Sequence, residues 1–458
     1  MTGKTLLDMG YEPGAWFKPA IDAARAAAAK GATTEQIIAV IDSHKPALAA
    51  PMRAPGDLAY HMNIRAETSE EAENVAAVER HMVELMRVPV VVAGAVMPDA
   101  CSAGSALGTI PVGGVVASKG IHPGMHSADI CCSMALTIFD GDIAPARMLD
   151  AGMSLSHFGG GGRPRGAQIA PDDAILTRFA GNVFLKDRVS DAIEHHATQG
   201  DGNHFFYVGR VASSGKLALV THYGSRKPGA MLYKAGMAAA EKNTRRVSPE
   251  TPRHNAWLDP ESNDGRAYWE ALQVIRAWTK SSHYAIHDRI AASLGLRVSD
   301  RFWNEHNFAF RKSDGLYYHG KGATPSWNGF ADDDSGLTLI PMNMAEPILI
   351  AKHRDAENGL GFAPHGAGRN FSRSAYMRRN GARTKAEIVA EQTAGIDARF
   401  FCGVPDVSEL PGAYKPAATV RAQIEEFGLA HVVDTIEPIG SIMAGDWQTQ
   451  APWRKTKR

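Results

Sequence analysis

A histidine flanked by glycines is the residue in this sequence best suited to covalent chemistry. It opens the segment His365-Gly366-Ala367-Gly368-Arg369. Glycines let a backbone approach a ligand closely, and the planar guanidinium of an arginine matches the oxygens of a phosphate. The segment therefore predicts a histidine nucleophile beside a phosphate. Taken alone, such a string more often marks a glycine-rich turn before a helix, so the rest of the chain must decide.

A second group of residues has the side chains of a transition-metal site. Asp129 and Cys132 are three residues apart, a spacing that can bring a carboxylate and a thiolate onto one ion. Three imidazoles join them, from His204, His222 and His306. This set could hold two divalent ions that share the thiolate, and it suits Mn²⁺, Zn²⁺ or Fe²⁺ better than Mg²⁺ or Ca²⁺. Paired ions would stabilise charge on a phosphate during displacement.

Strand ends are the elements that must position these histidines. His204 precedes the aromatic run 205–207, and His222 ends the apolar run 217–221. Binding sites on open sheets usually form where strands end. One histidine in such a place is more often a satisfied core residue, and several together make that interpretation weaker.

Hydrophobic periodicity predicts the other elements. Helices are expected over 17–29, 36–42, 69–85, 269–294 and 417–427, and strands over 88–92, 110–117 and 337–341. We interpret residues 1–60 as an N-terminal helical extension, 61–446 as the catalytic domain and 447–458 as a basic C-terminal tail.

The composition is typical of a folded, loop-rich α/β or α+β enzyme. Hydrophobic residues make up 44% of the 458 residues, and 45 glycines and 25 prolines provide turns. Lys+Arg and Asp+Glu both number 49, so no overall charge attracts nucleic acid and phosphate binding must come from local clusters. The N-terminus lacks the apolar stretch of a signal peptide, and four cysteines are too few for a disulfide framework. A soluble cytoplasmic protein is expected.

The order of the motifs closely resembles the RtcB family of RNA-splicing ligases. In chain order they read D-I-x-C from Asp129, G-N-H-F from Gly202, H-x-G-S-R from His222, H-N from His306, K-G-A-T from Lys321, H-G-A-G-R-x-x-S-R from His365 and A-Y-K from Ala413. The resemblance runs from about Asn74 to Asp446, and seven motifs in one order are highly specific although none is alone. It implies an α+β fold of mixed sheets with surrounding helices and a central dinuclear metal site.

The activity that this resemblance implies is a GTP- and Mn²⁺-dependent ligation of RNA. An RNA 3′-phosphate, or a 2′,3′-cyclic phosphate after its opening, would be joined to a 5′-hydroxyl in tRNA splicing or RNA repair. His365 would take GMP from GTP and pass it to the RNA 3′-phosphate, and the 5′-hydroxyl would displace it. RNA with these ends is the implied partner, and an archease-like activator is a second one.

The resemblance also implies residue roles by motif position. Cys132 would bridge two Mn²⁺ ions, with Asp129 and His306 completing one ion and His204 and His222 the other. The GTP site would comprise Asn203, Asn343, Met344, His365, Gly366, Ala367, Gly368 and Arg369. Within it, Asn203 and Arg369 would orient phosphates.

Several positions depart from the family pattern. Tyr207 replaces the glutamate of G-N-H-F-x-E and Ala444 the lysine of a closing Lys-Gly, two residues that contact the guanine base in the family. Cys101 replaces the histidine of M-P-D-x-H, Ser133 the glycine of D-I-x-C-G, and Gly320 the arginine of H-R-K-G-A. The metal and nucleophile sets are thus intact and the base pocket is changed, which indicates a divergent paralogue.

Three other functions compete with ligation. A dinuclear metal phosphatase or cyclic phosphodiesterase would keep the ions, but simple hydrolysis needs no histidine nucleophile. A nucleotidyl transferase that caps 3′-phosphate ends without ligation would keep both the metal ions and the histidine nucleophile. A nucleic-acid-binding protein with a structural site is disfavoured because all five ligands are retained.

Overall fold

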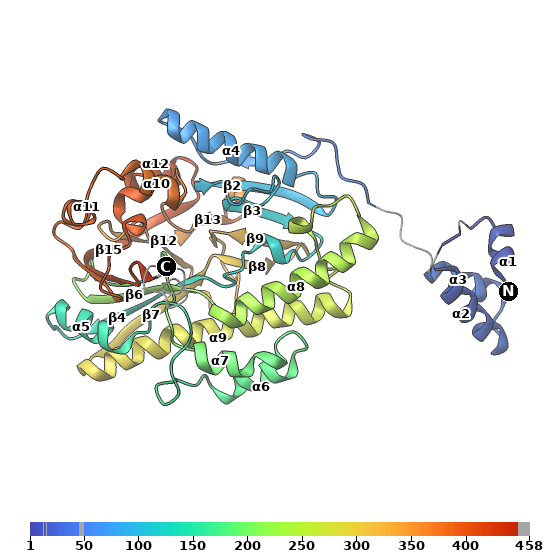
Figure 1. Ribbon diagram of the computed structural model, residues 1–458, viewed down its shortest axis with the longest axis horizontal. Helices are drawn as coiled ribbons and strands as arrows, with labels where there is room; N and C mark the ends of the chain where they lie inside the picture. The colour runs from blue at the N-terminus through green and yellow to red at the C-terminus, as the bar shows by residue number, and fades with distance from the viewer. Residues whose placement is uncertain (12, 15, 45–49, 448–458) are drawn as a thin grey trace, which may run out of the picture.

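Two mixed β-sheets form the centre of the main body, and helices surround them (Figure 1). The computed structural model describes residues 1–11, 13–14, 16–44 and 50–447. The larger sheet has the order β11-β12-β15-β5-β6-β4-β7, with β14 parallel to β15 and the other pairs antiparallel. Its strands are β4 (Ser133–Asp140), β5 (Phe205–Val211), β6 (Leu217–Tyr223), β7 (Arg297–Glu305), β11 (Leu337–Ile340), β12 (Ile348–His353), β14 (Asp397–Phe400) and β15 (Ala430–Met443). The α+β class with mixed sheets is confirmed.

The smaller sheet has five strands in the order β1-β2-β3-β9-β8. They are β1 (His61–Met62), β2 (Val91–Cys101), β3 (Val112–Ser118), β8 (Asn307–Arg311) and β9 (Tyr317–Lys321). A short pair, β10 (Ala323–Pro325) with β13 (Phe362–Pro364), leads into the segment that begins at His365.

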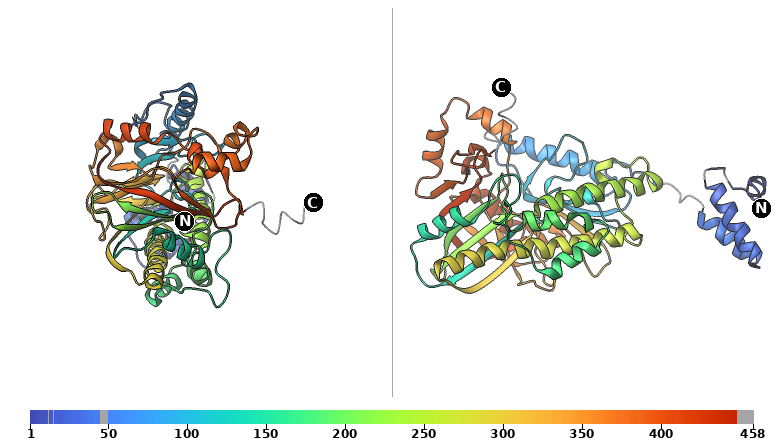
Figure 2. Two further views of the ribbon diagram at one scale, coloured as in Figure 1. Left: turned by 90° about the vertical axis from the view of Figure 1, so that its left-hand side faces the viewer. Right: turned by 60° about the horizontal axis from the view of Figure 1, so that its bottom comes forward.

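Helices cover the sheets on their outer faces. They are α4 (Ser69–Leu85), α5 (Pro145–Leu155), α6 (Asp173–Gly181), α7 (Val189–His195), α8 (Arg226–Val247), α9 (Asn263–Leu294), α10 (Arg373–Arg379), α11 (Lys385–Gln392) and α12 (Ala417–Glu426). Figure 2 shows the two long helices α8 and α9 lying side by side, and α9 also packs on β4 and β7. Among the described residues, no helix is both long and apolar enough to cross a membrane.

The N-terminal helices form a small unit with its own core. They are α1 (Gly3–Asp8), α2 (Phe17–Ala29) and α3 (Thr34–His44), and they pack around Leu6, Ala24 and Ile41. This unit lies beside the main body in Figure 1. The predicted extension over 1–60 thus contains one helix more than expected, and the predicted basic tail, except for Trp447, lies outside the described residues.

The helix predictions were more accurate than the strand predictions. The helices over 17–29 and 69–85 are observed at these bounds. The strand predicted over 88–92 is wrong for its first three residues, because the chain turns there and β2 begins at Val91. The apolar run predicts a strand, but Pro89 has no N–H group to donate to a neighbouring strand, so the ladder does not include it.

A buried polar seam joins α9 to the back of the larger sheet. His283 and His287 lie one turn apart on α9, both fully buried, and Thr221 Oγ1 is 2.7 Å from Nδ1 of the first and 2.8 Å from Nε2 of the second. Burial lowers the pKa of His287 to about 3, so the ring is neutral.

One arrangement of protons satisfies this seam. Nε2 of His283 lies 3.2 Å from the carbonyl oxygen of Tyr223, which can only accept, so that nitrogen carries the proton. Nδ1 of His283 then accepts from Thr221. Thr221 in turn accepts from His287, whose Nδ1 accepts from Thr137 at 2.7 Å. The central hydroxyl is therefore both donor and acceptor.

We predict that Thr221→Val lowers the free energy of unfolding by about 1–3 kcal/mol, because two buried imidazole nitrogens lose their partner. Urea unfolding measures this. Thr221→Ser, which keeps the hydroxyl, is the matched control and should lose less. Equal stability of the two variants would show that the hydrogen bonds of the Thr221 hydroxyl do not stabilise the fold.

Candidate metal centre and nucleotide pocket

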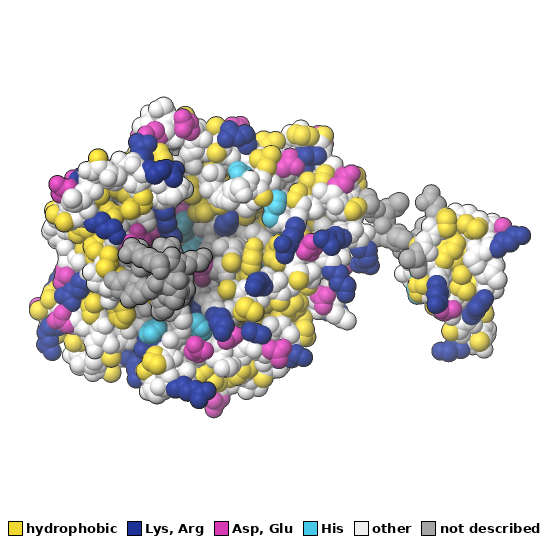
Figure 3. Space-filling view, in the orientation of Figure 1, with side chains coloured by type: hydrophobic (Ala, Val, Ile, Leu, Met, Phe, Trp, Pro, Cys, Tyr) yellow, Lys and Arg dark blue, Asp and Glu magenta, His cyan; other side chains and the backbone are white. Residues whose placement is uncertain are grey.

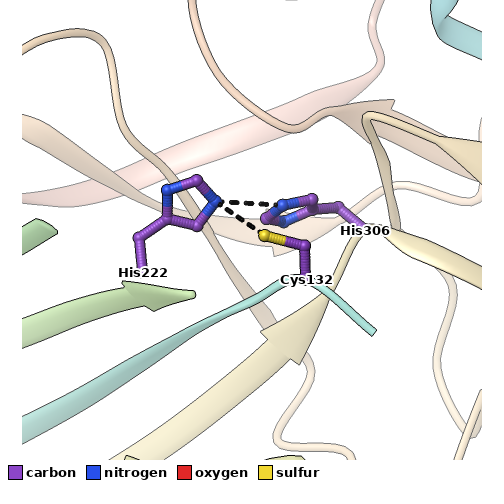
Figure 4. Close-up of side chains that lie close together, drawn as sticks. All are labelled: Cys132, His222 and His306. Atoms are coloured by element: carbon purple, nitrogen blue, oxygen red, sulfur yellow. Dashed lines mark hydrogen bonds between the residues drawn. The ribbon is translucent and has the colours of Figure 1, made fainter. Parts of the chain in front are cut away.

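Five side chains from distant parts of the chain converge on one place. Cys132 Sγ lies 3.2 Å from His222 Nε2 and 3.6 Å from His204 Nε2. His222 Nε2 is 3.2 Å from His306 Nε2, and Asp129 Oδ2 is 3.1 Å from His204 Nε2. Figure 4 shows His222 and His306 on either side of the thiol of Cys132. All five predicted metal ligands are thus brought together.

The five residues divide into two groups that share Cys132. One group is Cys132, His222 and His306, and the other is Asp129, Cys132 and His204, with donor atoms in each group within 4.8 Å of one another. These groups differ from the expected split, which paired Asp129 with His306. Strand order is the reason: β4 lies between β6 and β7, whose ends carry His222 and His306, and the sequence did not show that order.

The turn before β4 has a backbone that needs support from its neighbours. Ser127 and Cys131 have positive φ values of 73° and 56°, an uncommon conformation outside glycine. The backbone N–H of Cys131 donates to Asn307 O at 2.7 Å, and the backbone N–H of Ser225 donates to Ile130 O at 3.2 Å. A Cβ on Gly224 would collide with the carboxylate of Asp129. The H-N and H-x-G-S-R motifs thus hold the D-I-x-C turn as well as supplying histidines.

The ring orientations leave lone pairs facing the cluster. Nδ1 of His204 donates to the carbonyl of Gln199 at 2.7 Å, and Nδ1 of His222 donates to the carbonyl of Asn203 at 3.1 Å. Each Nε2 is then an unprotonated donor to a metal, the usual arrangement for histidine ligands. Burial lowers the pKa of His222 to about 3, which keeps its ring neutral. Several lone pairs this close repel one another unless a cation lies among them, so the donor set fits transition-metal ions.

His365 lies beside this cluster. It follows β13, and its Nδ1 donates to Oδ2 of Asp99 at 2.6 Å, where Asp99 is fully buried at the end of β2. Its ring centre is 4.9 Å from that of His306. Because Nδ1 carries the proton, Nε2 has a free lone pair and can act as a nucleophile. Sequence reasoning did not assign Asp99 a role, although it is the aspartate of M-P-D-x-H.

One pocket is lined by both His365 and His222 of the cluster, and its lining contains every residue predicted for the nucleotide. The lining includes Asn203, His222, Asn343, Met344, His365, Gly366, Ala367, Gly368 and Arg369. Its other wall is largely apolar, with Phe205, Tyr207, Met342, Ile348 and Met443. On the face drawn in Figure 3, histidine and acidic side chains gather in a hollow of the main body.

The guanidinium of Arg369, which the sequence predicts to orient phosphates, is bound by protein acceptors. Its Nη1 donates to Ser408 O at 2.6 Å, and its Nη2 lies 2.5 Å from Glu409 Oε2. Glu409 also pairs with Arg373 through its other oxygen, at 2.5 Å, and the side chain of Arg373 is half exposed. Glu409 lies 40 residues from Arg369, so nothing local in the sequence signals this contact. Of the two arginines, Arg373 has the more accessible guanidinium.

The residues that depart from the family pattern have structural explanations. The hydroxyl of Tyr207 donates to the carbonyl of Ile436 at 2.9 Å, and Ala444 is packed in the core beneath β5 and β15. A Cβ on Gly320 would lie 2.7 Å from Ala323 O, so no arginine fits there. The hydroxyl of Ser133 contacts His283 at 3.1 Å and extends the seam behind the cluster. The substituted residues therefore pack against, or form hydrogen bonds with, their neighbours in the interior.

Comparison with known proteins gives a family match and several relatives. The family model described as tRNA-splicing ligase RtcB matches residues 171–444, more than half of the chain. The chain is 27% identical over 326 residues to a tRNA-splicing ligase RtcB of Thermococcus kodakarensis, which covers 62% of the chain and 64% of the relative. It is 27% identical over 284 residues to one of Archaeoglobus fulgidus (53% and 58%) and 25% identical over 336 residues to one of Aeropyrum pernix (64% and 69%). The chain thus spans about two thirds or less of the length of these relatives.

We predict that the protein binds up to two transition-metal ions and that Cys132→Ala loses most of this binding, because Cys132 belongs to both groups. Metal analysis of the purified proteins measures the occupancy. Bound ions should also raise the melting temperature, since saturation at about a hundred times Kd adds about 2.7 kcal/mol.

Cys131→Ala removes the neighbouring buried thiol, which is in neither group, and is the matched control. It should keep its metal. Unchanged occupancy in Cys132→Ala would contradict the assignment.

Proposed function

The chain belongs to the RtcB family, and on that premise we propose that it is a metal-dependent RNA ligase. It would join an RNA end bearing a 3′-phosphate, or a 2′,3′-cyclic phosphate after water has opened the ring, to a 5′-hydroxyl end. The observation that carries this proposal is the position of His365. With its Nδ1 held by Asp99, it shares one pocket with His222 of the metal-ligand cluster, and its ring centre lies 4.9 Å from that of His306.

The covalent step follows from the tautomer of His365. Its Nε2 bonds to the α-phosphorus of GTP, and the bond from that phosphorus to the pyrophosphate leaving group breaks. The resulting phosphoramidate passes GMP to an oxygen of the RNA 3′-phosphate, which frees Nε2 again. The 5′-hydroxyl then attacks the activated phosphate and GMP leaves. Asp99 holds the ring in the reactive tautomer throughout.

Two Mn²⁺ ions in the cluster would neutralise phosphate charge and acidify the attacking hydroxyl. The residues that would hold them are Cys132 with His222 and His306, and Cys132 with Asp129 and His204. The half-exposed Arg373 is suited to a phosphate of the RNA, because its guanidinium is held by Glu409 at the pocket edge. An archease-like activator belongs to the same proposal.

The pocket favours nucleotidyl transfer over the hydrolytic alternative. A phosphatase or cyclic phosphodiesterase needs metal ions and water, but it has no use for a histidine whose tautomer is fixed by a buried carboxylate. An end-capping transferase would use the same residues up to the last step. Conversion of labelled RNA with the two end types into a longer product separates ligation from capping.

We predict that His365 carries a covalent nucleotide after incubation with α-labelled GTP and Mn²⁺. A phosphoramidate is labile in acid and stable in base, so the protein-bound label should show this pattern and disappear in His365→Ala. His431→Ala, which removes an exposed histidine on β15, is the control and should label normally. Label that persists in His365→Ala, or none in the wild type as a phosphatase predicts, would contradict the mechanism.

We predict weak selectivity between GTP and ATP in the same reaction. A site that reads guanine through a carboxylate and an ammonium rejects other bases at about 1–3 kcal/mol for each unpaired group. Here the hydroxyl of Tyr207 is engaged by a backbone carbonyl, and Ala444 has no donor. Competition between GTP and ATP measures the ratio.

The outcome that would refute weak selectivity is a large preference for GTP that survives removal of the residues after Asp446. Those residues include Lys455 and Lys457, which lie outside the described part of the chain and could supply an ammonium.

A further inference from the structure

Lys415 is a buried cation whose hydrogen bonds go to the backbone. It is 4% exposed, and its Nζ donates to the carbonyl of Pro98 at 2.9 Å and to that of Ala100 at 2.8 Å. These two carbonyls flank Asp99, the residue that binds the nucleophile. A buried ammonium is costly without partners, so this arrangement ties the side chain firmly to one segment of β2.

Through its main chain, Lys415 also binds the segment that carries His365. Its N–H donates to the carbonyl of Gly368 at 3.0 Å, in the segment that begins at His365. Gly368 has a φ of +70°, and a Cβ there would collide with the backbone of Asp99, so the two segments touch directly. One residue therefore binds both segments that carry the Asp99–His365 pair.

The orientation of the Asp99 carboxylate depends on this backbone. Its Oδ2 binds His365, and its Oδ1 has no hydrogen-bond partner among the described residues. A carboxylate anchored through one oxygen moves with its own backbone. Lys415 fixes that backbone on both sides of Asp99, while the side chain itself is absent from the pocket lining.

We propose that Lys415 is a positioning residue for the covalent step. It holds Asp99 against Nδ1 of His365 and thereby keeps the neutral ring in the tautomer whose Nε2 lone pair is directed into the pocket. The proposal rests on the proposed function only in taking His365 as the nucleophile. Lys415 acts through Asp99, so its effect should vanish once the carboxylate is gone.

A double-mutant cycle tests this dependence. The maximal rate of His365 labelling should fall by about tenfold or more in Lys415→Met and in Asp99→Asn, with little change in the apparent KM for nucleotide. The double variant should be no slower than Asp99→Asn within about twofold, because residues that act as a unit are not additive. Additive losses, or a loss confined to KM, would overturn the proposal.

Two further variants distinguish a loss of positioning from a general loss of stability. Arg53→Met is the matched control, since Arg53 is also a cation that binds backbone carbonyls, of Met86, Val88 and Pro89. It should change stability without changing the labelling rate. Lys415→Gln keeps two N–H donors and should lose less activity than Lys415→Met, and it replaces that variant if the latter does not fold.

A measurement without nucleotide separates this proposal from the proposed function. Diethyl pyrocarbonate acylates unprotonated imidazole nitrogens, and peptide mass spectrometry gives the rate at His365. The rate should fall in Lys415→Met or Lys415→Gln and should be the same in Asp99→Asn with and without the lysine substitution. An unchanged rate in both lysine variants would overturn the positioning role. If wild-type protein takes up no nucleotide, the proposed function fails while the acylation rates still decide the role of Lys415.

Discussion

Cys132 belongs to both groups of candidate ligands, and this shared position constrains the strands around it. A thiolate shared by two ions would need donors on both sides, and β4 lies between β6, which carries His222, and β7, which leads into His306. The turn that carries Asp129 must then bend back over Gly224, at positive φ values that neighbouring backbone groups stabilise. The order of the larger sheet and the site are consequences of the same requirement.

The two faces of the larger sheet differ in how their buried imidazole nitrogens are paired. On one face, lone pairs converge and would repel each other without cations. On the other, α9 meets the sheet through His283 and His287, where each nitrogen has a partner. Buried polar groups are tolerated when they are fully bonded, so the seam can fix α9 in register while the opposite face stays available for ions.

The sequence allowed the chemistry to be predicted better than its geometry. Residue type and motif order selected the five side chains that converge and the neighbouring His365, because metal binding and nucleophilic attack each require particular side chains. Strand order, by contrast, depends on pairings between distant segments, and the grouping of these side chains around Cys132 therefore differs from the expected one. The ion pair between Arg369 and Glu409 could not be predicted for the same reason, since the two residues meet only after folding. Asp99 was overlooked because a single carboxylate carries no spacing signal of its own.

The seam behind the cluster has a direction as well as a set of contacts. The carbonyl of Tyr223 fixes the proton at one end, and each later hydrogen bond points the same way as far as Thr137. Reversal would turn a lone pair toward that carbonyl, and protonating either ring would force a threonine hydroxyl to give up the hydrogen bond that it donates. With the pKa of His287 lowered to about 3, neither event accompanies ordinary changes in pH. The back of the sheet thus keeps one hydrogen-bond order without a charged ring, and the side chains that could bind ions lie on the opposite face.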